Sequence, residues 1–168
     1  VNLQHISEIQ FSRDLLLSTE FNARVYGDFE NTISGAGSVM EHVRTDIVEY
    51  LKEDDIVISR MQLDYVWSPR KDIFTKLSGG IYETMFAGYG IETLYKPFGK
   101  NYSLGFELFH VKQRSFDQRF SFKDYSTVTG HLNFGYSLPL GIESNISYGR
   151  YLAKDDGFTF DLGRRTRS

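Results

Sequence analysis

Side chains that could do chemistry are densest between residues 111 and 125, where cations, carboxylates and aromatic rings alternate along the chain. Arg114 and Arg119 could each form a bidentate ion pair with a carboxylate. Asp117 and Asp124 are the nearest partners, and such pairs would hold a long connection in one conformation. The same mixture of guanidinium groups and aromatic faces could instead bind an acidic or neutral sugar. We expect the structural role and keep sugar binding as the alternative.

A second set of residues could supply a nucleophile, a base and an acid for hydrolysis: His131, His110, Ser126 and Asp124. If residues 125–138 form a strand, Ser126 and His131 have opposite parity and point to opposite faces, which argues against a shared catalytic site. The four histidines lack metal-ligand spacing and the chain has no cysteine, so we expect no enzyme, cofactor or metal centre. A barrel enzyme that acts on lipid or polysaccharide, with His131 as its base, is kept as an alternative.

The elements that must position these residues can be read from strand alternation. The alternation is clearest in residues 15–29, whose odd positions are mostly apolar and whose even positions are polar or amphipathic. Residues 31–38 are rich in glycine and serine and are expected to form a loop. The sequence therefore predicts an all-β, antiparallel up-and-down meander of about ten strands, an outer-membrane β-barrel or a segment of one. The expected strands are 3–11, 15–29, 43–50, 56–67, 73–81, 89–95, 102–111, 125–138, 142–152 and 158–162.

In the predicted strands 56–67, 102–111, 125–138 and 142–152, most polar residues share one parity and point to one face of the sheet. In an outer-membrane barrel that face lines the lumen, while the apolar face contacts lipid. We therefore expect polysaccharide to contact the polar positions of the strands together with the loop described above. This candidate set is Arg60, Gln62, Asp64, Glu107, Arg114, Asp117, Arg119, Asn133 and Asn145.

The connections distinguish the two ends of the meander. Each of the three prolines lies in a different connection, and these are alternate connections along the chain, so they share one end. The proline connections are 68–72, 96–101 and 137–141, and the connections at the opposite end are 52–55, 82–88, 113–124 and 153–157. Short turns at one end and longer connections at the other are typical of an outer-membrane barrel, whose short end is periplasmic.

Composition narrows the class of protein further. No stretch approaches 18 consecutive apolar residues, which excludes a transmembrane helix but not a barrel. The formal charge of −3 gives no reason to expect a nucleic-acid partner. Aromatic residues near the strand ends favour girdles at the membrane interfaces, with ordinary cross-strand packing as the alternative for each one. They are Tyr65, Trp67, Tyr95, Tyr102, Tyr136, Tyr148 and Tyr151.

The length suits one domain, and we expect residues 1–168 to form a single β-barrel-type domain. The chain begins at Val1 without a signal peptide and stops in what reads as a strand, which predicts a segment of a longer protein or a chain processed at its N-terminus. A sheet that does not close has two unpaired edges, so further strands or a partner are expected to cover them.

Seven short segments, taken together and in order, resemble a known family. They are VRTD at 43–46, ISRMQLDY at 58–65, LSGG at 77–80, LYKPFG at 94–99, FDQRF at 116–120, TGH at 129–131 and GRYLA at 149–153. Over residues 43–162 the chain resembles the YjbH/GfcD family of exopolysaccharide and capsule biosynthesis proteins. The resemblance implies an outer-membrane lipoprotein barrel of a Gram-negative bacterium that acts in export or surface assembly of the polymer. Family members are longer, and their lipidated N-terminal cysteine is absent from this sequence.

The leading hypothesis is a non-enzymatic outer-membrane β-barrel component that helps an acidic or neutral exopolysaccharide, or a capsule, to cross or assemble at the cell surface. Its expected partners are outer-membrane lipid, the exopolysaccharide and other polysaccharide-secretion proteins. Besides the barrel enzyme, one further alternative is a soluble β-rich binding module in the periplasm, in which the same alternation packs two sheets together.

Overall fold

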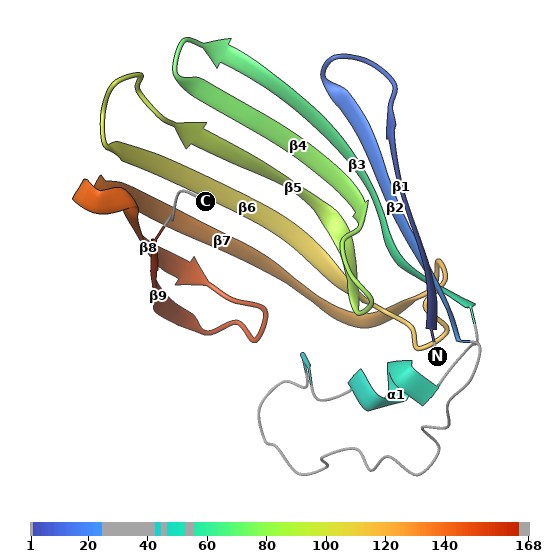
Figure 1. The fold of residues 1–168 in the computed structure, drawn as a ribbon. Coiled ribbons are helices and arrows are strands. Elements are labelled where there is room, and N and C mark those ends of the chain that lie inside the picture. The colour runs from blue at the N-terminus through green and yellow to red at the C-terminus, as the bar shows by residue number, and fades with distance from the viewer. Residues whose placement is uncertain (1, 25–42, 45–46, 53–55, 165–168) are drawn as a thin grey trace.

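Nine antiparallel strands form one sheet in which each strand pairs with the next along the chain. The computed structural model describes residues 2–24, 43–44, 47–52 and 56–164 (Figure 1). The strands are β1 (Asn2–Gln10), β2 (Leu15–Arg24), β3 (Ile56–Arg70), β4 (Ile73–Ile81), β5 (Phe86–Tyr95), β6 (Tyr102–Arg114), β7 (Phe122–Leu138), β8 (Ile142–Arg150) and β9 (Asp156–Arg164). The predicted all-β antiparallel meander is confirmed. The sheet is open, because β1 and β9 each have only one neighbour among the described strands.

The predicted strand at residues 43–50 is wrong. Residues Ile47–Lys52 form the short helix α1, so the sheet has nine strands where about ten were expected. Val43 and Tyr50 both pack against one buried cluster, although strand parity would have pointed them to opposite faces. Residues 25–29 of the second predicted strand, the loop 31–38 and residues 53–55 lie outside the described residues.

The largest differences in strand bounds at the N-terminal side are in β5 and β7, which each begin three residues earlier than predicted. β5 begins at Phe86 and β7 at Phe122, so the connection expected at 113–124 is reduced to residues 115–121. Glycine is depleted in strands, so Gly88 and Gly90 led to a predicted start of β5 that is too late in the sequence. The chain requires glycine at position 88, because a Cβ there would lie 2.0 Å from the carbonyl oxygen of His110 on the neighbouring strand.

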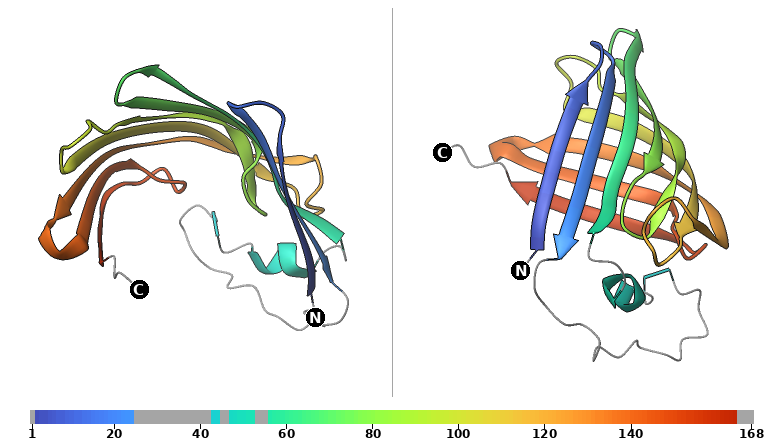
Figure 2. Two further views of the ribbon diagram at one scale, coloured as in Figure 1. Left: turned by 45° about the horizontal axis from the view of Figure 1, so that its top comes forward. Right: turned by 90° about the vertical axis from the view of Figure 1, so that its right-hand side faces the viewer.

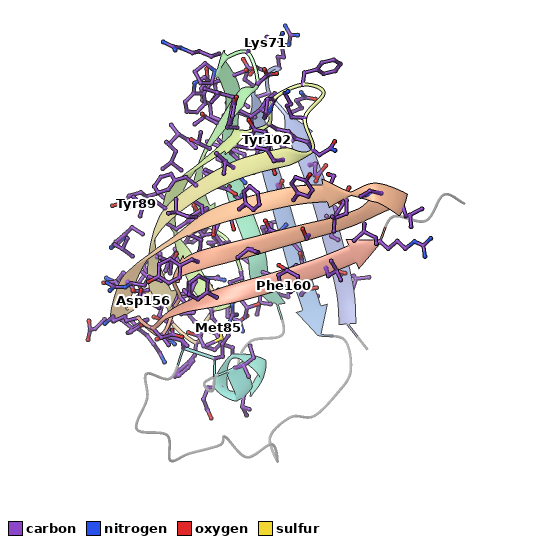
Figure 3. The ribbon with its side chains drawn as sticks, turned by 90° about the vertical axis from the view of Figure 1, so that its left-hand side faces the viewer. Lys71, Met85, Tyr89, Tyr102, Asp156 and Phe160 are labelled. Atoms are coloured by element: carbon purple, nitrogen blue, oxygen red, sulfur yellow. The ribbon has the colours of Figure 1, made fainter. Side chains whose placement is uncertain are left out.

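The three proline turns all lie at one end of the sheet, as predicted, together with the turn between β1 and β2. Neighbouring turns are hydrogen-bonded: the amide of Lys96 donates to the carbonyl of Asp72 (2.9 Å) and that of Ser137 to Asn101 (2.7 Å). We call this the turn end, and the opposite end, with connections 115–121 and 151–155, the loop end. Figure 3 shows Lys71 at the turn end and Met85 at the loop end, beside α1.

The sheet is curved like an arch and therefore has a convex and a concave face (Figure 2). The strand register aligns apolar positions on the convex face and polar positions on the concave face. The convex face includes Leu63, Leu77, Ile91, Phe106, Leu108, Leu132, Phe134, Ile146 and Phe160. The concave face includes Gln62, Asp64, Lys76, Glu92, Glu107, His131, Asn133, Asn145 and Asp161.

A small apolar cluster fills the concave side of the arch at the loop end. Tyr50 of α1 packs there with Met85, Phe86 and Val111, and its ring meets that of Phe116 edge-on at 5.0 Å between centroids. The strand register places Phe86 and Val111 on the same face as the polar set. Since α1 lies beneath the arch, this packing identifies the polar face as the concave one (Figure 2).

The guanidinium group of Arg114 holds the loop end together. The side chain is completely buried and donates hydrogen bonds to backbone carbonyl oxygens of β3, of the β4–β5 connection and of the 115–121 connection. The acceptors are Ile58 (2.8 Å), Glu83 (3.1 Å), Thr84 (3.0 Å), Gln118 and Arg119 (3.1 Å). The helix is fixed to the same point, because the Tyr50 hydroxyl donates to the carbonyl of Arg114 at 2.5 Å.

Replacing Arg114 with Met should lower the free energy of unfolding by about 3 kcal/mol or more, because several buried carbonyl groups lose their donor. Arg114→Lys should restore little of this loss, since one ammonium group cannot reproduce the planar fork of donors. Denaturant unfolding of the full-length protein, followed by circular dichroism, measures both. Lys71→Met at the exposed turn end is the control, with an expected change within about 0.5 kcal/mol. Equal effects at both positions would contradict the role of Arg114.

Candidate functional site

Four charged or titratable side chains form a row across the concave face. Lys76, Glu92, Glu107 and His131 are consecutive register partners on β4, β5, β6 and β7. Lys76 forms an ion pair with Glu92, and Nδ1 of His131 lies 2.7 Å from Oε1 of Glu107. The two carboxylates in the middle of the row are therefore directly opposite each other on neighbouring strands.

The contribution of these four side chains to the stability of the fold does not by itself explain why they lie together. Like charges directly opposite each other in a sheet are destabilising, and here each carboxylate is compensated only on its outer side. The side chains of Lys76 and Glu92 are about one-third exposed, and ion pairs at such exposure contribute at most about 1 kcal/mol. The concave face thus holds two adjacent carboxylates within reach of any molecule that enters the arch.

A hollow of about 320 Å³ lies beside this row, towards the turn end. It has space because Gly105 of β6 and Gly135 of β7 carry no side chain. One side of the hollow is apolar and is formed by Val66, Phe74 and Leu94. The other side is polar and is formed by Ser103, Asn133 and Asn145. The volume lies at the lower end of the range of about 300–1,000 Å³ that is usual for small-molecule sites.

Three of the residues expected to contact polysaccharide converge on this hollow, namely Glu107, Asn133 and Asn145. Gln62 and Asp64 lie on the same concave face but on β3, where the amide of Gln62 donates to the carboxylate of Asp64 at 2.8 Å. Arg60 is the register partner of Glu20 further along β3. The strand residues of the candidate set therefore share one face, and half of them share one hollow.

The loop residues of the candidate set lie at the loop end and serve the structure of the connection. Arg114 donates to carbonyl groups and not to the carboxylates that were expected as its partners. Asp117 accepts hydrogen bonds from the Ser121 hydroxyl at 2.7 and 2.6 Å and from the amide of Arg119 at 3.3 Å. These contacts support the structural interpretation of residues 111–125 over the sugar-binding alternative.

Two residues of the charged row, Lys76 and Glu92, were missed by sequence reasoning. Both occupy polar positions within predicted strands, so the signal was present. The missing information was the register between strands, which brings them beside Glu107. The short turns that join these strands restrict the register and could have been used to place them.

The structure separates Ser126 from His131, the expected base, but places Ser126 on the same face as His110. Ser126 is aligned with Lys112 on the convex face, whereas His131 lies on the concave face with its ring 4.6 Å from that of Tyr151. His110 stacks on Tyr89, on the convex face, at 5.3 Å. Within the described part of the chain, no three His, Asp or Glu side chains are grouped so that they could hold a metal ion. Nor is any described helix long and apolar enough to cross a membrane.

Comparison with known proteins agrees with the resemblance seen in the sequence. A family model described as "Exopolysaccharide biosynthesis protein YbjH" matches residues 1–168. The chain is also 34% identical, over 148 residues, to a protein of Escherichia coli (strain K12) named "Uncharacterized lipoprotein YjbH". This alignment covers 85% of the chain and 21% of the relative, so the chain spans about a fifth of the relative's length. No solved structure matches the chain.

Proposed function

Because the chain belongs to the YjbH family of exopolysaccharide biosynthesis proteins, we propose that it forms part of the wall of an outer-membrane β-barrel. In this proposal the barrel has no enzymatic activity and helps an exopolysaccharide or capsule polymer to cross or assemble at the cell surface. The convex face contacts lipid, and the concave face contacts the polymer. Other polysaccharide-secretion proteins are its expected partners.

One observation carries this proposal: the more exposed face of the sheet is apolar and the more sheltered face is polar. Leu132 and Phe160 on the convex face are 62% and 64% exposed, whereas Thr129 and Ser147 on the concave face are each 9% exposed. In water, burial of the apolar face would be favoured instead. Contact with the hydrocarbon of a bilayer accounts for the inversion, because barrel strands alternate between a lipid-facing and a lumen-facing side.

Aromatic residues at the turn end support the same orientation. Tyr65 and Trp67 stack on the convex face with ring centroids 5.4 Å apart, and Tyr95 lies 6.4 Å from Tyr102 on the adjacent strand. Phe98, at the tip of the β5–β6 turn, is 89% exposed. Amphipathic rings at this level suit a membrane interface, where one edge contacts lipid and the other contacts water.

The open edges and the relative's name support a larger membrane-associated assembly. β1 and β9 present unpaired backbone groups, which neither lipid nor water tolerates well on long exposed strands. The Escherichia coli relative is named a lipoprotein and is about five times longer than the aligned segment. We propose that further strands of the full-length protein, or a partner, complete the barrel, and that a lipid anchor attaches it to the outer membrane of a Gram-negative cell.

Replacing each of two neighbouring residues of β7 with Arg tests whether the convex face contacts lipid. Leu132→Arg should reduce the amount of full-length protein recovered in purified outer membranes, because Arg on a lipid-facing strand position is destabilising by about 2–4 kcal/mol near the bilayer midplane. Asn133→Arg, one residue away but on the concave face, is the matched control and should be tolerated. Immunoblotting of fractionated membranes measures both variants. This result would contradict the alternative that the protein is a soluble β-rich module. Solubility of the wild-type protein without detergent would support that alternative instead.

The Glu107–His131 contact favours a second candidate, a barrel enzyme with His131 as its base, since a carboxylate can orient an imidazole for proton transfer. A strain that lacks the gene should retain polymer inside the cell and secrete less of it, if the protein acts in export. Complementation with the His131→Ala variant should restore secretion to the wild-type amount, measured as extracellular polysaccharide. Loss of secretion with normal amounts of the variant protein would favour the enzyme.

A further inference from the structure

The hollow on the concave face has one apolar side and one polar side, which the register of the sheet explains. Phe74, Leu94, Gly105 and Asn133 are consecutive register partners on β4 to β7. Gly105 therefore lies between an apolar pair on one side and an amide on the other. Gly105 leaves the strand between Leu94 and Asn133 without a side chain, and the Asn133 side chain leans over it, since a Cβ on Gly105 would lie 3.1 Å from that of Asn133. The hollow of about 320 Å³ has room for one sugar ring between the apolar pair and the amide groups.

The apolar side of the hollow is open to a ligand. Phe74 is 47% exposed and Leu94 is 39% exposed, and both lie on the concave face beside the charged row. A pyranose ring has a face of C–H groups that packs on such a surface and an edge of hydroxyl groups that requires hydrogen-bonding partners. Asn133, Asn145 and Ser103 supply both donors and acceptors on the opposite side.

The charges of the hollow restrict which sugar it can hold. Its charged lining residues are Lys76, Glu92 and Glu107. Lys76 is already paired with Glu92, so among the charged lining residues Glu107 is left as an excess negative charge, with the imidazole of His131 beside it. A uronate or other acidic sugar would place its carboxylate against this excess, whereas an uncharged sugar would not.

We infer that this hollow binds one uncharged pyranose unit of the polymer, a neutral hexose or an N-acetylhexosamine, and discriminates against acidic sugars. The ring packs on Phe74 and Leu94, and its hydroxyl or acetamido groups bond to Asn133 and Asn145. The inference rests on the proposed contact between the concave face and the polymer. It adds the class of sugar and the residues that select it.

Binding of size-matched oligosaccharides to the full-length protein in detergent tests this inference. The probes are dextran and N-acetylchitooligosaccharides, which are neutral, and oligogalacturonate, which is acidic. At least one neutral probe should bind more tightly than oligogalacturonate in isothermal titration calorimetry. Asn145→Leu should weaken that binding about threefold to tenfold through loss of a hydrogen bond. Glu92→Gln should reduce the difference in affinity between the neutral probe and oligogalacturonate, because it removes one negative charge from the hollow.

The control is Gln10→Leu, which replaces an amide by the same aliphatic group on the concave face of β1, far along the sheet from the hollow. It should bind the neutral probe like the wild type. Preferential binding of oligogalacturonate that Asn145→Leu abolishes would overturn the sugar class and leave the contact with polymer intact. Absence of binding to every probe, in protein that still inserts into outer membranes, would overturn the hollow as a site without overturning the barrel.

Discussion

Side chains of a β-strand alternate between two faces, and in this sheet the strand register places the apolar positions of successive strands on the same side. Leu77, Ile91 and Leu108 are consecutive partners across three strands on the apolar face. One residue along each strand, Lys76, Glu92 and Glu107 are consecutive partners on the polar face. Because the period is two residues, a slip of one residue would exchange the faces of a whole strand. The lipid-facing surface, the charged row and the hollow all depend on this register.

Curvature decides which face becomes the interior, and the loop end helps to maintain it. Arg114 draws β3, the β4–β5 connection and the 115–121 connection to one guanidinium group, while Tyr50 packs α1 onto the concave side of the same region. The concave face is therefore filled at the loop end and open at the hollow, nearer the turn end. The apolar cluster thus occupies the loop end, and the hollow nearer the turn end is left open, with one apolar and one polar side.

Strand alternation and the proline turns were sufficient to predict the meander, its two ends and the polar face. They failed at residues 43–50, where a turn and the helix α1 bring Val43 and Tyr50 to one cluster, and at Gly88, where close strand approach requires a residue that strands otherwise avoid. Within the candidate site, the contacts between strands were harder to predict from the sequence than the face on which each residue lies. Glu107, Asn133 and Asn145 were identified from parity, but Lys76 and Glu92 needed the register, and the carbonyl partners of Arg114 come from segments distant in the sequence.

The central claim is that the convex face contacts lipid and the concave face contacts water. It is tested most directly by spin labels on single cysteines introduced at successive positions from 127 to 134 of β7 in the full-length protein, reconstituted into bilayers, since this segment contains no cysteine of its own. In the proposed orientation, labels at even positions should collide with oxygen dissolved in the lipid, and labels at odd positions with a water-soluble nickel chelate. Access of the nickel chelate to the even positions would contradict it.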